Sequence, residues 1–120
     1  MAVRAFRGAT QLDVDERSHL LMSTAELVTK VLHENKLEIA DLISISFSAT
    51  PDLRSEFPAV AARELGLDDV PLMCFVEMDV VGSMPRVIRL MIHAESKLQR
   101  TEVKHVYLRG AQSLRADLAK

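Results

Sequence analysis

The sequence contains a single cysteine, Cys74, so no disulfide can form within the chain. Tryptophan is absent, and aromatic residues make up only 4% of the chain. Basic residues are scattered instead of forming runs, and with 15 Lys and Arg against 17 Asp and Glu the net charge is -2. A chain without a basic surface field has little to attract a polynucleotide, so we expect no nucleic-acid partner.

Long apolar stretches are also missing. No segment approaches the roughly 20 apolar residues that a membrane-spanning helix requires, because charges interrupt each candidate. The opening MAVRAFRGAT carries arginines where a secretory signal peptide would need an uninterrupted apolar core. We therefore expect no membrane segment and a cytoplasmic location.

The usual signatures of metal and nucleotide chemistry are absent as well. The four histidines have no HxxxH or CxxC partner spacing, and no GxSxG elbow, P-loop or GxGxxG fingerprint occurs. The sequence thus predicts no metal site and no cofactor. Cys74 could act as a nucleophile, but a lone cysteine in an apolar segment is more often a small buried hydrophobe.

The composition that remains is that of a folded protein. A chain of 120 residues with 48% hydrophobic and 27% charged residues predicts one domain spanning residues 1–120. A domain this small buries a smaller fraction of its surface than a large one does. An oligomer that shares burial between subunits would therefore be a natural solution.

Alternating apolar and polar residues predict most of the strands. In residues 43–49, isoleucine, phenylalanine and alanine alternate with serine, which is typical of a strand with one apolar face. A first strand is predicted in residues 3–10, where Gly8 is expected to stop it. Three further strands are predicted later in the chain, in the segments 70–80, 86–94 and 102–110. The tail after the last of them is expected to be irregular.

Two helices are predicted between these strands. Apolar residues at helical spacing indicate a long helix over about residues 15–35, preceded by a capping box of Asp13 and Glu16. A short helix is expected from Pro58 to Gly66, with proline in its first turn and glycine just past its end. This order of elements predicts the α+β class, with the helices covering one face of a mixed β-sheet.

Arg89 places a charge inside the aliphatic run VIRLMI of residues 87–92. Burying an unpaired ion is costly, so an anion is expected opposite it. Glu77 interrupts another apolar run and could be that anion, which would make the pair structural; a bound ligand would instead make Arg89 functional. The residues alternating with Arg89 are all apolar and should meet the helices, so the face of Arg89 should look toward a cavity or another subunit.

Other arginines widen the case for an anion site. Guanidinium groups present a planar fork of donors that matches a carboxylate, so several converging arginines would bind a small polyanion. Taken singly, Arg4, Arg63 and Arg115 could be ordinary solvated charges, whereas Arg7 lies within a predicted strand. Tyr107 could be a half-buried strand aromatic whose hydroxyl reaches water.

Six segments, in order and across almost the whole chain, resemble the monofunctional, β-rich chorismate mutases: RGAT at 7–10, SATPDL at 48–53, FPA with RELG at 57–66, EMDV at 77–80, IRLM at 88–91 and HVYL at 105–108. The resemblance implies a homotrimer of subunits with a ferredoxin-like variant fold, whose sheets assemble as a pseudo-α/β-barrel with active sites between neighbours. It also implies conversion of chorismate to prephenate in phenylalanine and tyrosine biosynthesis.

The reaction implied by the resemblance suits a protein without cofactor motifs. It is a pericyclic step that needs no nucleophile, metal or obligatory proton transfer, so preorganisation and electrostatics suffice. By this resemblance Arg89 would stabilise negative charge on the ether oxygen, Arg7 with Tyr107 would hold the side-chain carboxylate, and Glu77 would accept the ring hydroxyl. The remaining implied substrate contacts are Met73, Cys74, Phe57, Ala59, Leu114, Arg63 and Arg115. Of these, Arg63 and Arg115 would lie near the mouth of the site.

Some features depart from the family pattern. Val60 stands where the family often has lysine, which removes one favourable charge at the entrance, and the chain ends at Lys120, which curtails any longer closing tail. Cys74 and Glu77 are three residues apart and face opposite ways in an ideal strand, so their joint contact with substrate needs a bend.

Two alternative functions stay open: a related trimeric enzyme acting on imines or enamines, and a non-catalytic sensor of aromatic metabolites.

Overall fold

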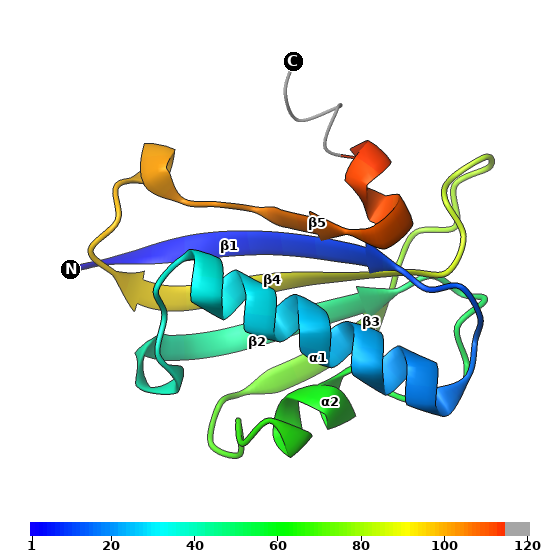
Figure 1. Ribbon diagram of the computed structural model, residues 1–120, viewed down its shortest axis with the longest axis horizontal. Helices are drawn as coiled ribbons and strands as arrows, with labels where there is room; N and C mark the ends of the chain where they lie inside the picture. The colour runs from blue at the N-terminus through cyan, green and yellow to red at the C-terminus, as the bar shows by residue number, and fades with distance from the viewer. Residues whose placement is uncertain (115–120) are drawn as a thin grey trace.

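A five-stranded mixed sheet carries the helices of this protein in a computed structural model, which describes residues 1–114. Strand β4 lies at the centre and runs antiparallel to β1 and β2, while the edge strands β5 and β3 run parallel to β1 and β2, in the order β3-β2-β4-β1-β5 (Figure 1). The predicted α+β class with a mixed sheet is confirmed. The elements are β1 (Ala2–Gln11), α1 (Arg17–Glu34), η1 (Ile39–Asp41), β2 (Leu42–Ala49), α2 (Ala59–Glu64), β3 (Leu72–Val76), β4 (Val87–Ser96), η2 (Arg100–Glu102), β5 (Val106–Leu108) and η3 (Arg109–Leu114).

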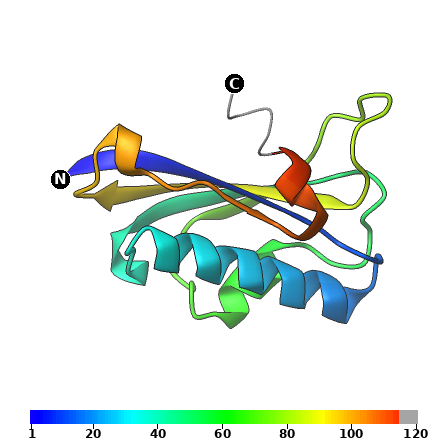
Figure 2. The ribbon, with the colours of Figure 1, turned by 45° about the horizontal axis from the view of Figure 1, so that its top comes forward.

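Both α-helices pack on the same face of the sheet, as the pattern of elements predicted (Figure 2). The main core lies between them and the sheet. The alternating residues Ile88, Leu90, Ile92 and Ala94 of β4 enter this core and are at most 4% exposed, which confirms the apolar face predicted for the strand. We call the opposite side of the sheet the open face. None of the helices within residues 1–114 has the length and apolar character needed to cross a bilayer.

Gly8 lies in the middle of β1, so the prediction that the strand ends there is wrong. Its α-carbon faces α1, where an added Cβ would lie 3.1 Å from Leu27 Cδ1 and 3.2 Å from Val31 Cγ2. Leu27 and Val31 are fully buried, and close-packed cores yield little to extra atoms. Glycine is therefore present to let the long helix approach the sheet, and not to turn the chain.

The start of α1 also differs from the prediction. The N-cap residue is Glu16, which makes no side-chain capping bond, so the expected box of Asp13 and Glu16 does not form. Instead the Asp13 backbone N–H donates at 3.0 Å to Nε2 of His19, a residue in the first turn of the helix. The short helix α2 agrees better with its prediction, because Pro58 is its N-cap and Gly66 follows it with φ of 97°.

Strands β2, β3 and β5 differ from the predicted runs at their ends. A register shift between Leu42 and Ser44 leaves Ile43 41% exposed, although the alternation holds from Ile45 onward. Strand β3 ends at Val76 instead of residue 80, because the Glu77 side chain accepts the next backbone N–H and the chain leaves the sheet. Strand β5 covers only residues 106–108.

The segment after β5 is a 3-10 helix, η3, where an irregular tail was expected. Arg109 adopts a left-handed φ of 54°, which reverses the chain direction at the end of the strand. Ala111 then packs on Ala9 and Val87, whose side chains alternate with the main-core residues, in a small second cluster. The C-terminal part of the described chain therefore covers one end of the open face.

Candidate active site

The open face carries one row of residues in register across all five strands. From β3 to β5 the row reads Phe75, Ser48, Arg89, Ala9 and Tyr107. Side chains that share a row and a face of a sheet are direct neighbours. The small side chain of Ala9 between Arg89 and Tyr107 leaves room for larger groups to meet above β1.

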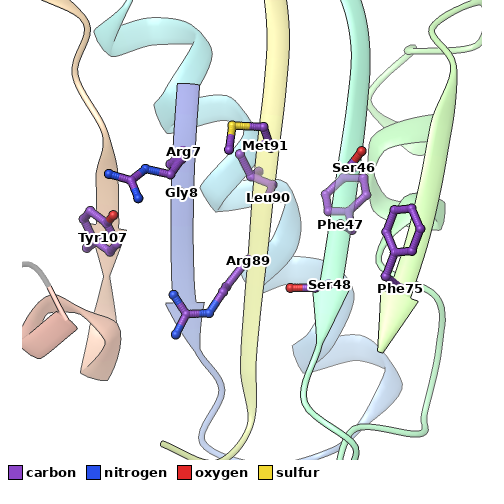
Figure 3. Close-up of a pocket in the computed structure, with 10 residues that line it drawn as sticks. All are labelled: Arg7, Gly8, Ser46, Phe47, Ser48, Phe75, Arg89, Leu90, Met91 and Tyr107. Carbon is purple, nitrogen blue, oxygen red and sulfur yellow. The ribbon is translucent and has the colours of Figure 1, made fainter. Parts of the chain in front are cut away.

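A cavity of about 230 Å³ lies over this row and the next one. Figure 3 shows the Arg89 guanidinium extending from β4 across β1, and the Arg7 side chain extending toward Tyr107. The structure thus brings together three residues that the sequence had singled out. The full lining is Arg7, Gly8, Ser46, Phe47, Ser48, Phe75, Arg89, Leu90, Met91 and Tyr107.

Glu77, the residue that follows β3, contacts two of the residues that line this cavity. Its Oε2 lies 3.2 Å from Arg89 Nε and accepts a hydrogen bond from Ser48 Oγ at 2.9 Å. Its Oε1 accepts the Met78 backbone N–H at 3.1 Å. The ion pair anticipated between Arg89 and Glu77 is therefore present, but the two side chains keep 44% and 30% of their surface exposed. Arg89 remains accessible to a second anion.

Arg7 is exposed on β1 and has no ion-pair partner among residues 1–114. Its backbone N–H donates at 3.0 Å to Nδ1 of His105, the residue just before β5. The imidazole therefore provides the acceptor for Arg7 next to the short ladder between β1 and β5. Burial lowers the pKa of His105 below its ordinary 6.5, and the positive charge of Arg7 lowers it further. A neutral imidazole keeps an unprotonated Nδ1, which accepts the backbone N–H of Arg7.

A second cavity of about 350 Å³ lies at the β3 edge and contains other predicted residues. Phe57 lines it with 67% of its surface exposed, and Cys74 lines it while packing against the main core. Arg17 and the Phe57 N–H both donate to Glu56, and the Phe57 bond is the larger cause of the lowered pKa of this carboxyl. Cys74 therefore does not accompany Glu77, and the joint contact does not form within one chain.

The other predicted site residues are dispersed over the described chain. Ala59 is 3% exposed and belongs to the main core, and Arg63 is exposed on α2. Met73 is 60% exposed on β3, and Leu114 packs near Tyr107 in the second cluster. Arg115 lies outside the described residues. A single chain thus assembles the Arg7, Arg89, Tyr107 and Glu77 group, but not the Phe57 and Arg63 group beside it.

Several lining residues were not predicted from the sequence, above all Ser46 and Ser48 on β2 and Phe75 on β3. A signal for the serines was present, because their alternation with apolar residues already placed them on the face away from the core. The alternation does not say which residues lie opposite them on the neighbouring strands. That pairing brings Ser48 beside Arg89 and Phe75.

The chemistry available in the cavity is electrostatic. Two guanidinium groups and one carboxylate leave an excess of positive charge, which suits an anion with more than one carboxylate. Residues 1–114 contain no group of three or more His, Cys, Asp or Glu side chains placed to hold a metal ion. The thiol of Cys74 lines the other cavity, away from Arg89 of the same chain.

Comparison with known proteins identifies the family. The family model described as chorismate mutase type I matches residues 3–118. The chain belongs to this family. Among curated proteins, the chorismate mutase AroH of Bacillus subtilis (strain 168) is 39% identical over 120 residues, spanning 99% of this chain and 94% of the relative. AroH of Thermus thermophilus is 41% identical over 117 residues, spanning 97% and 96%.

A solved structure shows the same fold. A chorismate mutase from Clostridium thermocellum superimposes with a TM-score of 0.90 and is 40% identical, over 92% of this chain and 98% of that chain. The resemblance stated from six short segments is thereby confirmed over nearly the full length of the chain.

Proposed function

We propose that this protein is a chorismate mutase, which converts chorismate to prephenate for phenylalanine and tyrosine biosynthesis. The observation that carries this proposal is the pair of guanidinium groups, Arg7 and Arg89, that line one open cavity, with the Glu77 carboxylate beside Arg89 as the only acidic partner of the two within residues 1–114. Chorismate is a dianion, so a cavity with excess positive charge suits it. The names of the three relatives point to the same reaction.

Arg89 is the main catalytic residue in this proposal. The breaking C–O bond places negative charge on the ether oxygen, and a fixed cation there stabilises the transition state more than the ground state. Arg89 is suited to the task because β4 is the central strand, paired on both sides, which fixes the position of its backbone. Its guanidinium stays protonated at any physiological pH.

Arg7 and Tyr107 would bind the side-chain carboxylate of the substrate, and Glu77 would accept the ring hydroxyl. The side chain of Arg7 has no acidic partner within residues 1–114, and it extends toward Tyr107 (Figure 3). Binding the two ends of a flexible dianion selects the chair in which its reacting carbons approach one another. Covalent catalysis is not part of the mechanism.

The proposed assembly is a homotrimer with active sites between subunits. Phe57 and Arg63, which are exposed, would then complete the site of a neighbouring subunit, which would account for their separation from Arg89 in one chain. Exposed apolar side chains concentrate along β3 and the segment after it, and a subunit interface would bury them. These residues are Met73, Phe75, Val76, Met78, Val80 and Val81.

The test of function is direct. Purified protein is incubated with chorismate while the ultraviolet absorbance of the substrate is followed, and the product is identified by mass spectrometry and chromatography. Loss of chorismate at the spontaneous rate would contradict the proposal. Tight binding of chorismate or prephenate without turnover would identify a sensor, and turnover of imines or enamines alone would identify a deaminase-like enzyme.

The shared site is tested by mixing two variants. Arg89→Ala and Arg63→Ala subunits are produced in one cell, so that mixed trimers form. If neighbours share a site, some mixed sites contain both wild-type arginines and the activity exceeds the mean of the two pure variants. Activity equal to that mean, or a monomer in sedimentation equilibrium, would contradict the shared site.

A further inference from the structure

The Glu77 carboxylate is held from three directions, and the contacts differ in kind. The Glu77 backbone N–H donates to Ala49 O at 2.9 Å, which fixes the start of the side chain against β2. Met78 N–H donates to Oε1 and Ser48 Oγ donates to Oε2. Arg89 Nε approaches Oε2 at 3.2 Å as an ion pair without an accompanying hydrogen bond.

This geometry is unusual for arginine beside a carboxylate. Such pairs frequently form a bidentate fork, in which two parallel N–H groups donate to the two carboxylate oxygens. A closed fork with Glu77 would occupy guanidinium donors of Arg89 and offset its charge. Arg89 would then stabilise a developing anion in the cavity less well.

We infer that Ser48 is a positioning residue, which holds the Glu77 carboxylate turned away from a bidentate fork and so keeps the Arg89 guanidinium available to substrate. The inference rests on the proposed function and deepens it. Ser48 pairs with Arg89 across β2 and β4, so the sheet itself fixes the hydroxyl beside both partners. Ser48 and Glu77 are 29 positions apart in the sequence, so no local sequence pattern predicts their contact.

The same hydrogen bonds orient the carboxylate for substrate. An ionised carboxylate has about four acceptor sites. On Oε2 these sites face Ser48 and Arg89, whereas on Oε1 only the Met78 N–H is a partner among residues 1–114. Oε1 therefore keeps an acceptor site for the ring hydroxyl proposed above. Without Ser48 both the direction of this site and the position of the guanidinium would change.

The experiment compares three variants in the full-length protein. Ser48→Ala removes the donor, Ser48→Thr keeps it on a residue that favours strands, and Ser44→Ala is the matched control on the same strand, outside the cavity lining. We expect Ser48→Ala to lower kcat about tenfold with little change in KM, since the lost contact orients a transition-state group. Ser48→Thr should restore kcat to within about threefold, and Ser44→Ala should leave it unchanged.

A double-mutant cycle separates positioning from a general structural role. Because Ser48 acts through Glu77, removing the hydroxyl in a Glu77→Ala background should change kcat less than about twofold. Equal effects of Ser48→Ala in both backgrounds would overturn the inference. A lower melting temperature with unchanged kcat would overturn it too.

A measurement without turnover keeps this inference separate from the proposed function. The Nε–H resonance of Arg89 is followed by nuclear magnetic resonance in wild type, Ser48→Ala and Ser44→Ala. Closure of the fork in Ser48→Ala should shift this resonance downfield, as a hydrogen bond forms where an ion pair stood. No shift would overturn the positioning role. Absence of turnover in wild type, with the shift present, would instead remove the proposed function and leave the positioning role standing.

Discussion

Replacement of Arg89 by alanine distinguishes a catalytic cation from half of a structural salt bridge. If Arg89 stabilises the ether oxygen, its loss should lower kcat by about 10²–10³-fold, or ~2.7–4 kcal/mol, the scale found for losing one preorganised donor at an oxyanion. Arg89→Lys should rescue poorly, because one ammonium group cannot reproduce the guanidinium fork.

The expected effect of Arg89→Ala on stability is much smaller. The two partners of the ion pair are 44% and 30% exposed, and pairs of this kind contribute about 0–1 kcal/mol to the free energy of unfolding. Glu77 also keeps its bonds from Ser48 and the Met78 N–H after the replacement. For a domain of this size such a loss lowers the melting temperature by about 4 °C or less.

The assay measures both quantities on the same preparations. Chorismate consumption yields kcat and KM, and calorimetry yields the melting temperature of wild type, Arg89→Ala and Arg89→Lys. Arg100→Ala is the control, because it removes one exposed positive charge on η2 outside the cavity lining. Intact kcat together with a melting temperature lowered well beyond that of the control would refute the catalytic role and establish the structural pair.

Three further outcomes are expected. Gly8→Ala should lower the free energy of unfolding by about 1–3 kcal/mol in urea titrations, because the new Cβ would lie 3.1 Å from a fully buried Leu27; an unchanged midpoint would contradict the close approach. The lowered pKa of His105 means that the unfolded chain binds its proton more readily, so stability should fall as pH drops below about 6.5, and His105→Gln should flatten this dependence between about pH 8 and pH 5. Val60→Lys should raise kcat/KM about threefold at low ionic strength through faster capture of the dianion, an effect that salt should abolish and that the neutral control Val60→Gln should lack.

Patterns local to the chain allowed much of the fold to be predicted. Side chains alternate along a strand whatever its neighbours are, so the apolar face of β4 and the serine face of β2 could be read directly. Helical spacing located α1 to within about two residues at each end. The boundaries were wrong where a distant contact decides them, as when α1 passes close enough to require Gly8, or when η3 folds back over Ala9.

The class of the fold, the family and the residues able to bind an anion could be inferred without coordinates, because periodicity, ordered motifs and charge are properties of the chain. The partners that those residues meet depend on the three-dimensional fold. Strand register brings Ser48, Arg89 and Tyr107 into one row, and Glu77 joins them because β3 ends one residue earlier. Cys74, only three residues before Glu77, faces the other side of the sheet edge and a different cavity. Register is set by packing between segments far apart in sequence. The partners of Arg89 therefore follow from strand pairing, which no single segment of the sequence contains.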